Sequence, residues 1–359
     1  MAAPAAIVLP YRLAGFAFFS QTNRIMHTRF PRAYAGIELC RRQKPQEHPS
    51  IMALLSSASL LSAPKRRSFL HWPFWLTAAV VIAGGLSVAM HWDDRGLLWV
   101  KEGFESKAIQ KESVWLPEYR VDIDAKVLPG MEDDEASDLA YSPATRTLFA
   151  VMGKNPFLVE LNLEGDVLRQ IPLVGWSNPE GVAVLEGGQL AIVDERDHDM
   201  TLVKVDAATT TLNRADFKPY DLGESVKSNK GFEALAWDPA RKRIVIGEER
   251  PPKLYALDSD GHGPLAGDKR HLPSDELDLR NLSALSVDPR TGHLLVLSAD
   301  SNMLLELDEH GEQVSFMTLL GGFNGLKDTL PRAEGVAMDE SGTLYMVSEP
   351  NLFYRFRKE

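Results

Sequence analysis

The stretch RAEGVAMDESGTLYMVSEP, residues 332–350, decides the fold because it is one β-hairpin with an acidic side chain at each end. Two apolar strands, 335–338 and 343–347, flank the segment DESG, whose residues are typical of a tight turn. Glu334 comes directly before the first strand, and Glu349 follows the second. The hairpin predicts a packed β-sheet that carries two carboxylates at one edge.

The same hairpin occurs four more times upstream, at intervals of about 50 residues. The copies read SDLAYSPATRTLFAVMGK, PEGVAVLEGGQLAIVDE, FEALAWDPARKRIVIGEE and LSALSVDPRTGHLLVLSAD. A third apolar segment follows each hairpin, for example FLVELNLEG, and several units contain a fourth, such as VLRQIPL. Short strands with this period predict an all-β, five-bladed β-propeller with four-stranded blades. A six-bladed propeller with one degenerate blade and a β-sandwich are the alternatives, but a sandwich does not explain so regular a repeat.

The last unit contains only three strands, the third of which reaches residue 356. The segment EYRVDIDAKV, residues 118–127, precedes the first unit and has the pattern of a strand. We expect it to pair with residues 352–357 as the outer strand of the last blade. This pairing would close the ring without leaving an open sheet edge.

The acids at the hairpin ends recur with the repeat. Strand one of each unit is rich in small and apolar residues, which predicts that it is the innermost strand of its blade. Asp138, Glu180, Glu233 and Glu334 share the position before strand one, where the other unit has Ser283. Glu195, Glu249 and Glu349 share the position after strand two, where the others have Lys154 and Ala299. The repeat therefore predicts two rings of carboxylates at the mouth of the central channel.

Converging carboxylates repel one another by a few kcal/mol at an effective dielectric constant of about 20. They must bind protons, pair with basic residues or hold a cation. The candidate basic residues are Lys154, Arg196, Lys230, Arg250 and Arg332. A cation held by oxygen ligands alone suits Ca²⁺, and no cluster of His and Cys favours zinc. The candidate metal ligands are Asp138, Glu180, Glu233, Glu334, Glu195, Glu249 and Glu349; a solvated acidic rim with scattered salt bridges is the alternative.

Charge and cysteine content exclude several classes of protein. The net charge is −11, and because residues 1–51 contribute +5 and residues 52–91 contribute +3, residues 92–359 carry −19. So acidic a body repels phosphate backbones, and we expect no nucleic-acid partner. The one cysteine, Cys40, lies outside the predicted propeller, which excludes disulfides and cysteine nucleophiles there.

The region before the propeller predicts a membrane anchor. Residues 72–90 contain no charge, Lys65, Arg66 and Arg67 precede them, and Asp93 and Asp94 follow. This pattern predicts one transmembrane signal anchor at residues 72–91, in the bacterial inner membrane, with the C-terminal domain in the periplasm. A cleaved signal peptide is the alternative. The remaining divisions are a non-native or disordered extension at 1–51, with Met52 as the true start, a linker at 92–114 and the propeller at 115–359.

The segments NPEGVAVLEGGQLAIVDER, KGFEALAWDPARKRIVIGEERPPKLYAL and PRAEGVAMDESGTLYMVSEPNLFYRF resemble the SdiA-regulated family of YjiK-like bacterial proteins. The resemblance extends over residues 115–356. It implies a five-bladed propeller that is distantly related to NHL repeats, follows a membrane anchor and has a calcium site. It implies no particular biochemical activity.

Two functions remain open on the sequence. The first is a calcium-binding propeller whose mouth binds an unknown ligand or protein. The second is a calcium-dependent hydrolase, because Glu180-Gly181 and Glu334-Gly335 are similar to the Glu-Gly motif of lactonase propellers, and phytase propellers are a comparable distant possibility. No G-x-S-x-G, H-E-x-x-H or P-loop motif occurs, so no catalytic residue is assigned.

Overall fold

A computed structural model describes residues 72–89, 92–131, 134–223, 231–265, 267–274, 277 and 279–359. The predicted extension at 1–51, the basic residues 65–67 and Lys230 lie outside these residues. The chain divides into two units, 1–67 and 68–359, and the described residues all belong to the second.

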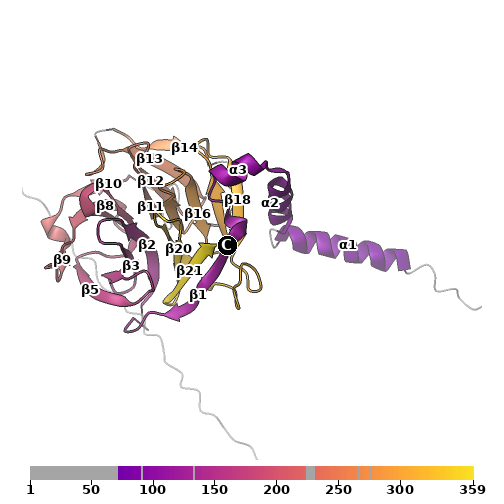
Figure 1. Cartoon of the computed structure of the whole chain (residues 1–359), viewed down its shortest axis with the longest axis horizontal. Coiled ribbons are helices and arrows are strands. Elements are labelled where there is room, and N and C mark those ends of the chain that lie inside the picture. Colours follow the sequence, from indigo (N-terminus) through magenta and orange to yellow (C-terminus); the bar gives the residue numbers. More distant parts are fainter. Residues whose placement is uncertain are drawn as a thin grey trace, which may run out of the picture. The chain divides into compact units, whose positions relative to one another are not determined.

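The second unit contains a five-bladed β-propeller, which confirms the predicted fold class (Figure 1). Each blade is a sheet whose four main strands run antiparallel, and in blades 1 to 4 these strands follow the order of the sequence from the innermost strand outward. Blade 1 contains β2 (Ala136–Ser142), β3 (Thr147–Met152), β4 (Phe157–Leu161) and β5 (Val167–Val174). Blade 2 contains β6 (Pro179–Val184), β7 (Gln189–Asp194), β8 (Asp199–Lys204) and β10 (Pro219–Asp221). Blade 3 contains β11 (Phe232–Asp238), β12 (Arg243–Glu248), β13 (Lys253–Asp258) and β14 (Arg270–Leu272). Blade 4 contains β15 (Ala284–Val287), β16 (Leu294–Ser298), β17 (Met303–Leu307) and β18 (Gln313–Thr318).

Blade 5 is closed by a strand from the other end of the propeller, as predicted. It contains β19 (Ala333–Met338), β20 (Leu344–Ser348), β21 (Leu352–Lys358) and, outermost, β1 (Tyr119–Val127). β1 runs antiparallel to β21, with Tyr119 opposite Lys358 and Val127 opposite Leu352. Arg355 on β21 donates hydrogen bonds to both carboxylate oxygens of Asp122 on β1, at 2.9–3.2 Å. The short strand β9 (Leu212–Asn213) adds to the outer edge of blade 1 in parallel with β5.

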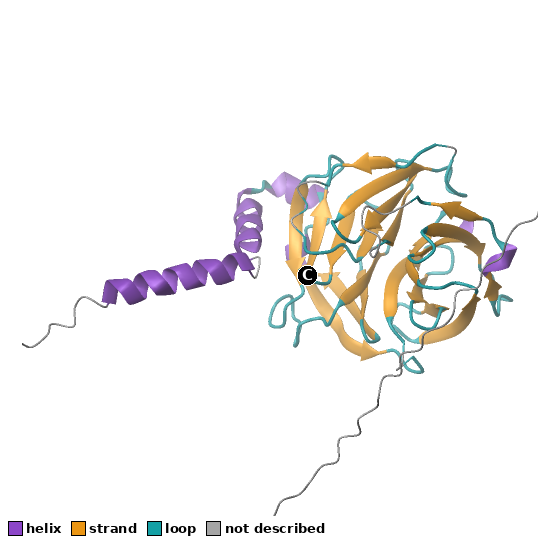
Figure 2. Ribbon diagram, turned by 180° about the vertical axis from the view of Figure 1, so that it is seen from behind, coloured by secondary structure: helices purple, strands orange, loops and turns teal. Residues whose placement is uncertain are grey.

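The first strand of each blade is its innermost strand, which also confirms the prediction. β2, β6, β11, β15 and β19 each contact the first strand of both neighbouring blades, so they form a closed ring around the channel. Figure 2 shows the strands of the blades in orange. Residues of these strands, including Ala140, Val184 and Ser286, line a hollow of ≈ 70 Å³.

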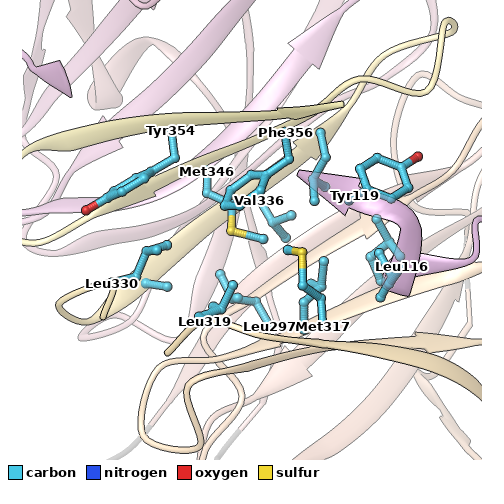
Figure 3. Close-up of a cluster of buried hydrophobic side chains, with 14 of the residues drawn as sticks. Leu116, Tyr119, Leu297, Met317, Leu319, Leu330, Val336, Met346, Tyr354 and Phe356 are labelled. Atoms are coloured by element: carbon cyan, nitrogen blue, oxygen red, sulfur yellow. The ribbon is translucent and has the colours of Figure 1, made fainter. Parts of the chain in front are cut away.

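The region predicted as a linker contains two helices, α2 (Trp92–Phe104) and α3 (Lys107–Glu112). After them, residues Leu116 and Tyr119 enter the apolar core between blades 4 and 5, where they lie near Met317 and Phe356 (Figure 3). Glu306, a fully buried residue of β17, accepts hydrogen bonds from the backbone N–H groups of Val114 and Trp115. The segment that leads into β1 is thus fixed to blade 4.

Helix α1 (Trp72–Ala89) covers most of the predicted anchor, and its large apolar side chains, such as Trp75 and Ile82, are exposed. None of the helices among the described residues meets the length and apolarity that a membrane span requires.

Candidate functional site

The strand registers show which residues occupy equivalent places at the channel mouth. Gly181 pairs with Val193, Ala234 with Gly247 and Gly335 with Val347, and in each blade the preceding glutamate is the extra residue of a β-bulge. In blade 1 the residue that pairs at this place is Asp138, opposite Val151. Asp138 is therefore equivalent to the glycines, and its predicted equivalence to the glutamates is wrong by one residue.

The inner ring therefore consists of three glutamates and two serines: Ser137, Glu180, Glu233, Ser283 and Glu334. The outer ring also shifts by one residue in blade 1. The backbone N–H of Gly153 donates to the carbonyl of Glu135, and the backbone N–H of Glu195 donates in the same way to the carbonyl of Asn178 in blade 2. Gly153, and not Lys154, thus corresponds to Glu195. The outer ring consists of Gly153, Glu195, Glu249, Ala299 and Glu349.

Asp138 has a structural role one layer below the mouth. It is completely buried, and its carboxylate accepts hydrogen bonds from its neighbour Leu139 (2.8 Å) and from the N–H of Val182 in blade 2 (2.9 Å). Burial raises its pKa well above the ordinary range, although the two N–H donors act in the opposite direction. This side chain joins the inner strands of blades 1 and 2 and is not free to face a ligand.

The glycine of each Glu-Gly pair is explained by packing. A β-carbon at Gly181 would lie 2.7 Å from the backbone oxygen of Glu233 in the next blade. A β-carbon at Gly335 would lie 2.7 Å from the backbone nitrogen of Leu139. Inner strands approach so closely here that only glycine fits without a shift. The similarity of these motifs to those of lactonases therefore has a sufficient cause in the fold itself.

Glu180 is a ring carboxylate whose pKa is strongly raised. Burial is the largest cause, and together with the charges of Glu195, Glu334 and Glu349 it raises the pKa to about 8. A hydrogen bond with the Ser137 hydroxyl acts in the opposite direction. Near neutral pH this carboxyl group thus holds a proton that a cation could replace.

Glu334 and Glu349 share one basic partner. The two amino groups of the Arg332 guanidinium lie 3.2 Å from a carboxylate oxygen of Glu334 and 2.9 Å from one of Glu349. Burial raises the pKa of Glu334 to about 7 even though Arg332 and the Ser283 hydroxyl lower it. Burial also raises the pKa of Glu349, against the effect of Arg332. Arg332 therefore occupies the place of a bridging cation between the two rings.

The remaining ring carboxylates contact neighbours in their own or the next blade. Glu195 accepts hydrogen bonds from the Asn178 amide (2.9 Å) and from the N–H of Gly231 (3.2 Å) in blade 3. The Arg250 guanidinium lies 3.0 Å from buried Glu249 and also contacts Asp300 in blade 4. Glu233 is partly buried at its place in blade 3. The mouth is thus a network of oxygen atoms in which protons and arginines balance part of the charge.

The possible metal ligands at the mouth fit a hard cation chemically, since they are carboxylate, hydroxyl and amide oxygens. Around Gly153, where a side chain is missing, the nearest atoms are the oxygens of Ser137, Glu180 and Asn178. Within the described part of the chain, however, no three His, Cys, Asp or Glu side chains lie close enough together to hold a metal ion. Any metal site in this mouth therefore requires side chains such as those of Glu180 and Glu334 to converge.

Sequence reasoning missed three polar residues of the mouth: Ser137, Asn178 and Asn281. Asn281 donates to Ser283 at 3.0 Å and accepts from Ser298 at 2.8 Å, so it organises blade 4, one of the two blades that have no acid in either ring. Each of the two asparagines stands two residues before the inner-ring residue of its blade, where blade 5 has Arg332. That constant spacing is the signal by which they could have been found.

The family model described as SdiA-regulated matches residues 111–357, which include all of the propeller except the last residue of β21. Similar solved structures include a chain of a nidogen/laminin complex (16% identity, TM-score 0.41, 59% of this chain and 72% of that one). A virginiamycin B lyase from Staphylococcus aureus (10%, TM-score 0.37, 67% and 74%) and a streptogramin B lyase (8%, TM-score 0.42, 67% and 98%) are also similar. At these values the solved structures say nothing about function.

Proposed function

The chain therefore belongs to the SdiA-regulated family, and we propose that its propeller binds a hard cation, Ca²⁺, at the channel mouth and presents that mouth to a ligand or protein. The observation that carries the proposal is the equivalent placement of Glu180, Glu233 and Glu334 in one ring. Two of these carboxyl groups have pKa values raised to about 8 and about 7.

A cation stabilises such a ring because it relieves both causes of the raised pKa values. It replaces the lost water of the buried carboxylates, and it screens their mutual repulsion. Ca²⁺ accepts six to eight oxygen ligands in loose geometry, and the hydroxyls and amides of Ser137, Asn178 and Ser283 lie beside the glutamates. We expect Ca²⁺ to displace protons from Glu180 and Glu334 and to compete with Arg332 for Glu334.

Calorimetric titration tests the proposal through the protons released. Ca²⁺ added to the purified protein at pH 7 should bind with release of protons, which makes the observed heat depend on the ionisation enthalpy of the buffer. Affinity should rise from pH 6 to pH 8.5. Glu180→Gln should weaken binding and reduce proton release, whereas Glu164→Gln, on an exposed hairpin of blade 1, should change neither. Binding without proton release, or no heat at millimolar Ca²⁺, would contradict the proposal.

The hydrolase alternative has no observation in its favour. Its motif evidence, the pairs Glu180-Gly181 and Glu334-Gly335, is accounted for by the close approach of the inner strands. Catalysis would also require a metal with an open coordination position and a base beside it. The binding function is therefore the one we retain.

We also propose that the apolar segment 72–90 anchors the protein in the bacterial inner membrane, with the propeller in the periplasm. The support is its uncharged sequence, the basic residues before it and the exposed apolar side chains of α1. The 18 residues of α1 extend about 27 Å at 1.5 Å per residue, so a span of about 30 Å needs residues beyond Ala89. A reporter fused after Glu359 should be active in the periplasm, and the protein should resist a carbonate wash. Recovery of a soluble body cleaved near Met90 would contradict the anchor.

A further inference from the structure

Helix α2 uses one side to contact the propeller. Its Arg95 guanidinium donates to the carbonyl of Ser301, and the Lys101 ammonium donates to that of Gln313 at 2.6 Å. Leu98, between them, packs on the apolar core of blades 3 and 4. Glu102 is 9% exposed and accepts a hydrogen bond from the N–H of Phe316 on β18, at 2.7 Å. On this side of α2, Arg95, Lys101 and Glu102 therefore all form hydrogen bonds with the propeller.

Apart from Asp93 in the first turn, the opposite side of α2 carries no charge. Successive residues of a helix are about 100° apart, so the residues opposite those on the propeller side are Gly96, Leu97, Trp99, Val100, Gly103 and Phe104. Leu97 is 70% exposed, Trp99 71% and Phe104 87%. Trp99, Val100 and Phe104 continue, with Trp115 and Pro117, around an open hollow of ≈ 460 Å³. Single exposed apolar side chains are common, but a whole helix face of them marks an interaction surface.

The place of α2 in the chain identifies what covers this face. α1 ends at Ala89 and α2 begins at Trp92, so their ends can lie no more than about 11 Å apart. If α1 is anchored in a bilayer, α2 must begin close to the surface of that bilayer. Trp and Phe on a helix face that is apolar beyond its first turn suit the boundary between headgroups and acyl chains. A soluble partner would have to reach the face through this narrow space.

We propose that the outward face of α2, defined by Leu97, Trp99, Val100 and Phe104, lies in the interfacial region of the lipid bilayer. The inference rests on the proposed anchor. α2 then connects the membrane to blade 4, because its polar side contacts the propeller and its apolar side contacts the lipid. The propeller is thereby kept at a fixed distance from the membrane.

Spin-label accessibility in nanodiscs tests this inference on the full chain. Cys40 is the only cysteine in the sequence, so Cys40→Ser gives a background for single nitroxide labels. Labels replace Leu97 and Phe104 on α2, Val81 on α1 and Leu168 on an exposed strand of blade 1. At positions 97 and 104 the ratio of collisions with oxygen to collisions with a nickel chelate should be several-fold higher than at position 168. Because all four side chains are exposed, labelling them leaves the fold intact, which a thermal melt checks.

The outcomes separate the inference from the anchor. Water-like ratios at 97 and 104 with a lipid-like ratio at 81 would overturn the inference and keep the anchor. Lipid-like ratios at 97 and 104 with a water-like ratio at 81 would support the inference and remove the anchor. Labels at 97 and 104 that are shielded from both reagents and broaden one another would show that a second copy of the chain covers this face, which also overturns the inference.

Discussion

Replacement of Glu180 by glutamine removes one ionisable group from the inner ring while keeping the size of the side chain. The glutamine carbonyl can still accept the hydrogen bond from Ser137. The folded-state pKa of Glu180 is raised from the ordinary 4.5 to about 8. Stability contributed by this group is therefore fully present below pH 4.5 and is lost as the pH rises through 8, because the folded protein must give up a proton that it holds more tightly than the unfolded chain.

The pKa difference sets the magnitude of the effect. At 1.36 kcal/mol for each pKa unit, the loss between pH 4.5 and pH 8 has an upper limit of roughly 5 kcal/mol. Glu180 is partly exposed, which reduces the penalty, so we expect on the order of 2–3 kcal/mol. For a domain of this size, that corresponds to a Tm difference on the order of 5–10 °C.

Thermal unfolding between pH 5 and pH 8.5 in the presence of EGTA measures this effect. Wild-type protein should lose stability over this range, and Glu180→Gln should lose less, so that it melts above wild type at pH 8 and close to it at pH 5. Glu164→Gln is the control and should follow wild type at every pH. If wild type and Glu180→Gln show parallel curves, Glu180 is not a buried, protonated member of a repelling ring, and the argument for a cation at the mouth falls with it.

Three further predictions concern the neighbours of Glu180. Arg332→Gln removes the guanidinium between Glu334 and Glu349, so it should lower the free energy of unfolding in EGTA at pH 8 by about 1 kcal/mol and raise the affinity for calcium. Weaker calcium binding would mean that Arg332 supports the site instead of competing for it. Gly335→Ala should destabilise the propeller by about 1–3 kcal/mol in urea unfolding, because its β-carbon would lie 2.5 Å from the Val347 side chain. Gly96→Ala, whose β-carbon would meet nothing within 4 Å, is the matched control, and an equal effect of the two substitutions would disprove the packing account. Asp138→Asn should cost about 1–3 kcal/mol, because an amide nitrogen cannot accept one of the two N–H bonds. Since the pKa of Asp138 is raised in the folded protein, this cost should shrink as the pH rises toward that pKa; unchanged stability at low pH would show that the link to Val182 is unimportant.

The architecture of the propeller was readable from the sequence because it depends on signals that repeat. Alternating strands, turn residues and a period of about 50 residues predict the blades, and a three-stranded last unit predicts the pairing of β1 with β21. Each of these signals occurs several times, so an error in one copy does not change the result. The helices at residues 92–112 belong to no repeat, and they were expected only as a linker.

The site was less readable because it depends on single-residue register. The first acid of each copy suggests that Asp138 corresponds to Glu180. The apolar cores of the inner strands, LAY against VAV and VAM, place Ser137 there instead. A β-bulge at the mouth hides this one-residue difference, since the pairing shifts just where the acids occur. The raised pKa values could not be predicted either, because they follow from burial in three dimensions.

The pairing that closes the ring also determines how the propeller would respond to mechanical tension. Tyr119 at the start of β1 lies opposite Lys358 at the end of β21, so the two ends of the propeller leave the last blade at the same place. A force applied between them would open the antiparallel pair one hydrogen bond at a time, as a zipper opens, and would not shear the whole ladder at once. Blade 5 is therefore the mechanically weak point of the ring. Such a force would first meet the ion pair between Lys358 and Glu118 and then, four positions into the pair, the ion pair between Arg355 and Asp122.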